Sequence, residues 1–97
     1  MNIKITGKEL KATDSIKNYI EKKCERLVKY FGEDFDVQAT IKTEGKDQVA
    51  EMHVNTTNGV FRAVTGSKDL YASIDKNIDI VEGQIRKMKT NNQIILS

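Results

Sequence analysis

The chain has 97 residues, a mass of 11.0 kDa and a formal net charge of +2. That length supports one core and therefore one domain over residues 1–97, and 38% apolar with 31% charged residues is typical of a globular protein. Nothing resembles a transmembrane helix or a secretory signal. The single cysteine, Cys24, excludes a disulfide framework and a four-ligand zinc site, so we expect a reducing, cytoplasmic location.

The first two expected elements are a strand and a helix. Residues 2–6 alternate apolar and polar side chains, which predicts a short strand. Thr13 then has the character of an N-cap, and apolar residues recur at helical spacing as far as Phe31. We expect one helix over this stretch, ended by Gly32.

Three strands are expected next. Apolar and polar residues alternate over 37–41, 50–54 and 61–65. Residues 44–46 (Glu-Gly-Lys) form the first expected turn, and Asn58-Gly59 is a strong signal for a hairpin between the last two strands.

The last expected element is a second helix. Ser67 is its candidate cap, with Asp69 in the first turn. Its apolar stripe consists of Leu70, Ile74, Ile78, Val81, Ile85 and Met88. Residues 91–97 are expected to form a flexible tail.

The order β-α-β-β-β-α, with one apolar face on every element, predicts an α+β fold. The simplest burial places both helices on one face of a four-stranded sheet and leaves the other face in water. The first helix is then a crossover between strands that are free to run parallel.

The sequence offers no persuasive catalytic group. His53, the only histidine, is expected on the solvent face of its strand, beside Glu51 and Asn55, which do not complete a catalytic set. Cys24 falls on the apolar stripe of the first helix, so we expect a buried thiol rather than a nucleophile. We therefore expect a protein that is not an enzyme and that binds no metal or cofactor.

Basic residues gather on both expected helices. Lys22, Arg26 and Lys29 share a stripe on the first, and Arg86 and Lys87 lie near the end of the second. Two helices side by side would direct these bases along one groove, where they would neutralise phosphates. Alternatively, they are ordinary solvated lysines and arginines that helix C-termini favour. Spacing leaves both interpretations open.

Several motifs along the chain carry a family resemblance. Residues 69–75 read Asp-Leu-Tyr-Ala-Ser-Ile-Asp, and residues 84–89 read Gln-Ile-Arg-Lys-Met-Lys. Together with residues 3–8 and 27–31, they resemble the bacterial ribosome hibernation-promoting factors and ribosome-associated inhibitors. The resemblance extends over nearly the whole chain, as a short member or as the N-terminal domain of a long one.

The resemblance implies a fold similar to double-stranded-RNA-binding domains and a cytoplasmic, non-enzymatic function. Such a protein binds the small ribosomal subunit between head and body, overlaps the sites of messenger and transfer RNA, and stops translation under stress or in stationary phase. It implies no membrane, no small-molecule substrate and a monomer off the ribosome. Carried over by position, the residues that bind ribosomal RNA are Lys22, Lys23, Arg26, Lys29, Lys76, Arg86, Lys87 and Lys89.

The chain departs from the family pattern on the second helix. Family members usually carry bases at the positions of Ile80 and Gly83, and Glu82 adds a negative charge here. These departures, together with the exposed apolar Ile80, support an alternative function: a protein-interaction module that has kept the fold and lost RNA affinity.

Overall fold

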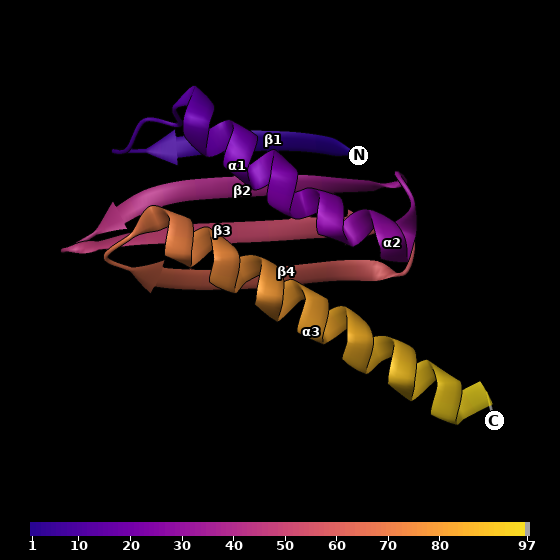
Figure 1. Cartoon of the computed structure of the whole chain (residues 1–97). Helices are drawn as coiled ribbons and strands as arrows, with labels where there is room; N and C mark the ends of the chain where they lie inside the picture. The colour runs from indigo at the N-terminus through magenta and orange to yellow at the C-terminus, as the bar shows by residue number, and fades with distance from the viewer. Residues whose placement is uncertain (97) are drawn as a thin grey trace.

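The computed structural model describes residues 1–96, with their side chains as far as Met88 (Figure 1). The elements in chain order are β1 (Asn2–Lys8), α1 (Asp14–Cys24), the 3-10 helix η1 (Glu25–Leu27), α2 (Val28–Phe31), β2 (Phe35–Glu44), β3 (Asp47–Thr56), β4 (Gly59–Ser67) and α3 (Leu70–Leu96). This confirms the predicted order. The first helix has the predicted extent, but a tightened 3-10 turn divides it into three consecutive segments.

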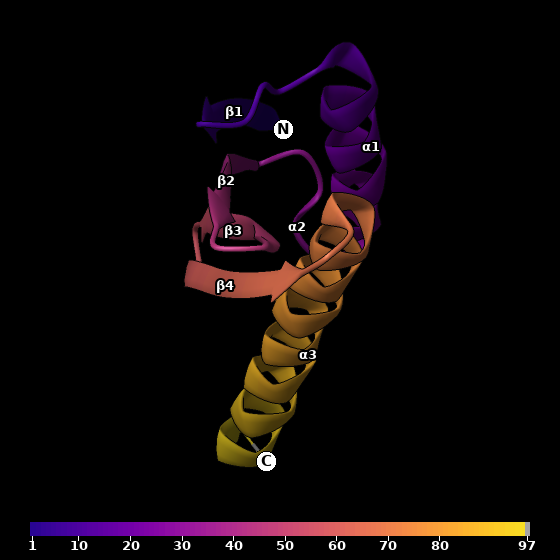
Figure 2. The same ribbon diagram turned by 90° about the vertical axis from the view of Figure 1, so that its left-hand side faces the viewer.

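The four strands form one sheet in the order β1-β2-β3-β4. β1 pairs with β2 in parallel, while β2–β3 and β3–β4 are antiparallel hairpins. The helices all lie on one face of the sheet, which Figure 2 shows edge-on. The predicted α+β fold is therefore confirmed, including the crossover helix between parallel strands.

The core lies between the sheet and the helices. Its buried strand residues include Val37, Ala39, Ile41, Met52, Val54 and Phe61, and its buried helix residues include Ile16, Ile20, Leu27, Ile74, Ile78, Val81 and Ile85. Cys24 is fully buried among them, and this burial raises the pKa of its thiol to about 12. The thiol is thus a core group, as the apolar stripe predicted.

One predicted helix cap is confirmed and one is wrong. The Thr13 hydroxyl accepts a hydrogen bond from the Ile16 amide at 3.3 Å and caps α1. Ser67, however, is the last residue of β4, and Asp69 caps α3: its carboxylate accepts from the Tyr71 amide at 3.0 Å. Asp69 lies immediately before the first helical residue, where a side-chain acceptor reaches the unpaired amides of the first turn.

Two boundaries also differ from the prediction. The β3–β4 turn consists of Thr57 and Asn58, one residue earlier than expected, because Gly59 already pairs with Thr56. The residues expected to form a tail belong to α3 as far as Leu96; no glycine or proline after Gly83 interrupts the helix. Ser97 lies outside the described residues. Among residues 1–96, no helix combines the length and apolar character that crossing a membrane requires.

Candidate nucleic-acid interface

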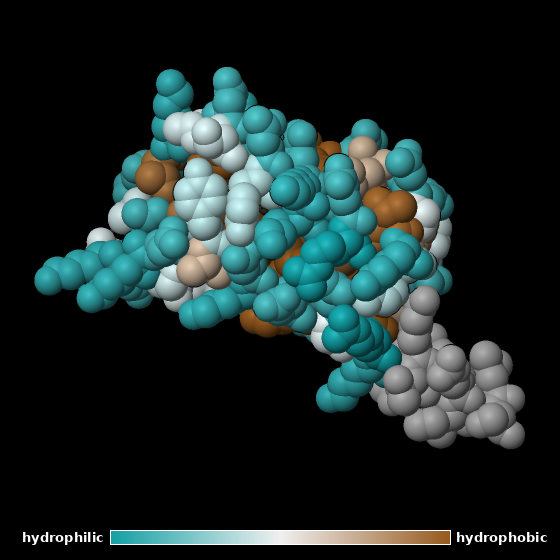
Figure 3. Space-filling model, viewed as in Figure 1, coloured by the Kyte–Doolittle hydropathy of each residue, from teal (hydrophilic) through white to brown (hydrophobic). Residues whose placement is uncertain are grey.

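The outer surface of the helical layer is dominated by hydrophilic side chains (Figure 3). Between α1–α2 and α3, these side chains form a band of ion pairs and hydrogen bonds, which we call the helix seam. The seam comprises Tyr19, Lys23, Arg26, Lys29 and Tyr30 from α1, η1 and α2, and Asp75, Asp79, Glu82 and Arg86 from α3. Spacings of four, three and four along α3 place its four members on one side of that helix.

At one end of the seam, Asp75 joins the two helices. The Tyr19 hydroxyl donates to Asp75 Oδ1 at 2.7 Å, and Lys23 Nζ lies 3.3 Å from the same oxygen. The hydrogen bond to Asp75, followed by burial, raises the pKa of Tyr19 above 10.0. The ring of Tyr71 meets that of Tyr19 edge to face, with 4.8 Å between centroids. Tyr71 and Asp75 therefore hold α3 against α1.

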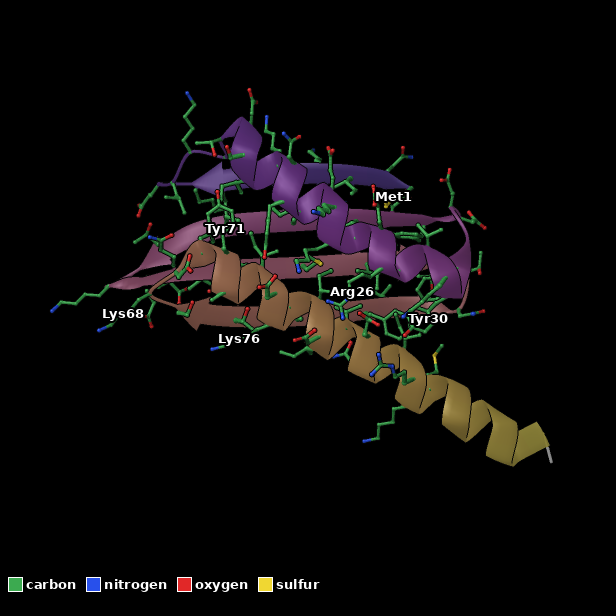
Figure 4. The ribbon with its side chains drawn as sticks, viewed as in Figure 1. Met1, Arg26, Tyr30, Lys68, Tyr71 and Lys76 are labelled. Carbon is green, nitrogen blue, oxygen red and sulfur yellow. The ribbon has the colours of Figure 1, made fainter. Side chains whose placement is uncertain are left out.

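At the other end, the seam centres on Glu82, whose side chain is only 1% exposed. The Tyr30 hydroxyl donates to Glu82 Oε2 at 3.0 Å. Arg86 Nη2 donates to the same oxygen at 3.2 Å, and Lys29 Nζ lies 3.6 Å from it. Arg26 contacts the other oxygen, Oε1, in an ion pair without hydrogen-bond alignment. We call Glu82 and its three bases the Glu82 cluster; Figure 4 labels Arg26 and Tyr30 between the helices.

The Glu82 carboxylate is charged despite its burial. Burial raises the pKa of Glu82, but the Tyr30 hydrogen bond and the three basic side chains outweigh that effect and hold the pKa below its ordinary value of 4.5. A buried carboxylate is tolerated only with such partners. In the sequence, Glu82 counts only as an added negative charge; in the structure, that charge is buried and surrounded by three bases.

The predicted RNA-binding bases divide into two groups. Lys23, Arg26, Lys29 and Arg86 meet in the helix seam. Lys22, Lys76 and Lys87 are exposed, and within the described part of the chain none forms an ion pair. Lys76 lies on the side of α3 away from α1 (Figure 4). The side chain of Lys89 lies outside the described residues.

The two departures on α3 are both at the surface. Ile80 is 41% exposed. Gly83 is exposed as well, and a Cβ atom there would meet no atom within 4 Å. Neither position contributes to the core, so the fold does not require an isoleucine or a glycine there.

The open face of the sheet carries a separate small network. His53 Nε2 lies 2.9 Å from Glu51 Oε1, and Arg62 Nη2 donates to the same oxygen at 3.2 Å. The hydrogen bond from His53 is the largest influence that lowers the pKa of Glu51. His53 is partly exposed on the solvent face of β3, as the alternation predicted, beside the cross-strand ion pair of Glu51 with Arg62.

The fold and the site together define a class: small α+β domains in which a segmented first helix and a long second helix cover one face of a sheet and expose basic side chains. The family model described as sigma 54 modulation protein / S30EA ribosomal protein matches residues 3–93. The chain belongs to this family.

Individual relatives agree with this assignment. A ribosome hibernation promoting factor from Acidithiobacillus ferridurans is 40% identical over 78 residues, which are 77% of this chain and 100% of the relative. A ribosome hibernation promotion factor from Deinococcus radiodurans is 33% identical over 92 residues, 89% of this chain and 48% of the relative. The chain thus spans about half the length of several curated relatives.

A solved structure shows the same fold. The N-terminal domain of Thermus thermophilus Protein Y is 36% identical, with a TM-score of 0.84 over 91% of this chain and 99% of that one. The resemblance predicted from the motifs is confirmed at the level of the family.

Proposed function

We propose that the chain binds the small ribosomal subunit through its helical layer and halts translation by occupying the decoding region, where messenger and transfer RNA bind. The observation that carries this proposal is the Glu82 cluster, which presents three cations on one side of a domain with this family's fold. The names of the relatives, ribosome hibernation factors, support the same function.

The mechanism is steric occlusion by a non-enzymatic binding protein that acts in the cytoplasm as a monomer. Phosphate contacts supply a large share of affinity for RNA, and structured RNA is recognised chiefly by shape and backbone. The bases Lys22, Lys76 and Lys87 extend the positive surface beyond the helix seam and complete the proposed interface with the four seam bases and Lys89.

Co-sedimentation with purified small subunits across a salt series tests this function. If about four phosphates are neutralised, the affinity falls more than tenfold over a fourfold rise in salt. A protein-interaction module with an apolar contact would respond little to salt, so a flat salt response favours that alternative.

A matched pair of variants tests which face binds. The helical variant replaces Lys22, Lys76 and Lys87 with Gln. The control variant replaces Lys4 and Lys8 on β1 and Lys46 in the β2–β3 turn, also with Gln. Both remove three positive charges, so they alter long-range attraction equally. The proposal expects the helical variant to bind subunits at least several-fold more weakly than the other; equal losses would contradict it.

The decoding region itself is tested by competition. Subunits loaded with messenger RNA and transfer RNA should bind the chain much more weakly than empty subunits, because the proposed sites overlap. Undiminished binding to loaded subunits would place the chain elsewhere on the subunit.

A further inference from the structure

We propose that Glu82 is a positioning residue for RNA binding, whose buried carboxylate assembles three cations into one phosphate-binding site. The inference rests on the proposed function and deepens it. It assigns Glu82 a role that favours RNA binding, although its negative charge alone would repel RNA phosphates.

Three bases converge on the one buried carboxylate. Lys29 Nζ and Arg86 Nη2 lie 3.6 and 3.2 Å from the same carboxylate oxygen, and Arg26 contacts the other oxygen. Cations this close repel one another strongly unless an anion lies between them. Glu82 therefore holds side chains together that would otherwise separate and sample many rotamers in water.

The cations of the Glu82 cluster are accessible to a ligand, and the anion is not. The carboxylate is 1% exposed, whereas the side chains of Arg26, Lys29 and Arg86 are 42–64% exposed. Three bases surround one buried acid, and one net positive charge remains even when the exposed Asp79 beside Arg26 is counted. Arg26 has five N–H donors and Lys29 three, more than their contacts with Glu82 and Asp79 occupy, so both retain donors for a phosphate. A phosphate approaching the Glu82 cluster therefore meets its three cations before it meets Glu82.

Asp79, one helical turn earlier on α3, provides a contrast. Its side chain is 67% exposed and lies 3.4 Å from Arg26 Nη2. An acid at the surface confronts an incoming phosphate directly and competes with it for Arg26. Two acids of equal charge on α3 therefore have opposite effects: Glu82 assembles the site and Asp79 weakens it.

The test compares Glu82→Gln with Asp79→Asn, because each removes one negative charge from the same helix. Two probes are used: purified small subunits, and an RNA duplex of about 16 base pairs, the length that a double-stranded-RNA-binding domain spans. We expect Asp79→Asn to tighten binding of both probes roughly two- to threefold. We expect Glu82→Gln to weaken it roughly fivefold or more, although the protein becomes more positive.

A second readout separates positioning from mere stabilisation. The slope of log affinity against log salt counts the phosphates neutralised together. A dispersed cluster neutralises fewer, so Glu82→Gln should lower this slope by about one contact, measured where circular dichroism shows the variant folded. If Glu82 only stabilised the fold, the slope of log affinity against log salt, measured on the folded variant, would equal that of wild type.

Two further variants keep the test decisive if Glu82→Gln does not fold. Glu82→Asp preserves the charge but retracts the carboxylate, and should also weaken binding; Asp79→Glu is its control at the exposed acid and should not. Tyr30→Phe removes the hydroxyl that donates to Glu82 while keeping the ring that Lys29 overlies, 5.2 Å from its centroid. It should weaken binding less than Glu82→Asp.

The outcomes separate the inference from the proposed function. If wild type binds subunits and duplex but Glu82→Gln tightens both as Asp79→Asn does, Glu82 only subtracts charge and the inference fails while the function stands. If wild type binds the duplex but not subunits, and Glu82→Gln weakens duplex binding, the proposed function fails and the inference stands. Binding of neither probe contradicts both.

Discussion

The two ends of the helix seam are built from the same parts. At each end a tyrosine hydroxyl from the first helical segments donates to a carboxylate of α3: Tyr19 to Asp75 at 2.7 Å, and Tyr30 to Glu82 at 3.0 Å. At each end a base contacts that carboxylate. The surroundings differ, however, because Asp75 is 44% exposed with one lysine, whereas Glu82 is 1% exposed with three bases.

The comparison shows that the burial of the acid and the number of bases around it, not the type of contact, decide what such a contact between helices does. At the Asp75 end one acid balances one base, so the contact connects the two helices and leaves no net charge. At the Glu82 end three bases face the buried acid and the exposed Asp79, so one positive charge remains, and the bases are more exposed than Glu82. One end is thus a structural link, and the other links the helices and also forms a cationic surface.

The largest effect is expected for Arg26→Glu. This change removes a partner of the buried carboxylate and places a second acid beside it, so the free energy of unfolding should fall by about 2–4 kcal/mol. Urea denaturation measures it. Lys22→Glu is the control, since Lys22 is exposed on the same helix and should change stability by only about 0.5 kcal/mol. Equal losses in the two variants would show that Glu82 does not depend on Arg26.

The comparison between the ends is tested directly by neutral isosteres. Glu82→Gln leaves three bases without their anion and should lower the free energy of unfolding by about 1–2 kcal/mol. Asp75→Asn breaks an exposed pair and should cost less than about 1 kcal/mol. Thermal and urea unfolding of both variants measure the difference, and a larger loss from Asp75→Asn would reverse our interpretation of the two ends.

At acid pH, wild type and Glu82→Gln should have the same free energy of unfolding. The pKa of Glu82 is lower in the folded protein than its ordinary value of 4.5, so its stabilising contribution is complete above that value and lost as pH falls through the folded pKa. Protonated Glu82 then resembles glutamine. Urea denaturation from pH 7 to about pH 3 should show the two proteins converging below about pH 4.5; a constant difference would contradict a charged Glu82.

Most of the fold was predictable because it depends on local patterns. Alternation located every strand, and Thr13 and Gly32 bounded the first helical segments. The errors arose where two neighbouring residues are equally suited to one position. Ser67 and Asp69 are both good caps, and only the end of β4 decides between them. A hairpin signal likewise locates a turn to within a residue.

The site was harder because its contacts are long-range. Spacing identified the bases but not their partners, since Tyr30 and Glu82 lie 52 residues apart and meet only through the packing of α3 beside α2. One signal was available: Asp75, Asp79 and Glu82 form an acidic stripe that complements the basic stripe of the first helix. Burial, which makes Glu82 different from Asp79, is not readable from that stripe.

The smallest effect concerns Gly83, which follows Glu82 but lies on the outer side of α3. Glycine inside a helix is less stable than alanine because its unfolded backbone is freer, and a Cβ atom here would meet nothing within 4 Å. Gly83→Ala should therefore raise the free energy of unfolding by about 0.5–1 kcal/mol, measured by urea denaturation. A loss of stability would instead mean that this position needs a glycine for a close backbone approach.

Gly83→Arg tests whether this position also affects binding to the small subunit. An arginine at this position lies four residues after Asp79, an arrangement that favours an ion pair along the helix and draws that acid away from Arg26. It should match the stability gain of Gly83→Ala and, in addition, tighten binding to small subunits, because it adds a cation beside the Glu82 cluster without touching the buried carboxylate. Gly83→Ala is the control, since it supplies the helix propensity without the charge. If the two variants sediment equally with subunits, the outer side of α3 does not face RNA at this position, and the proposed interface is confined to the helix seam.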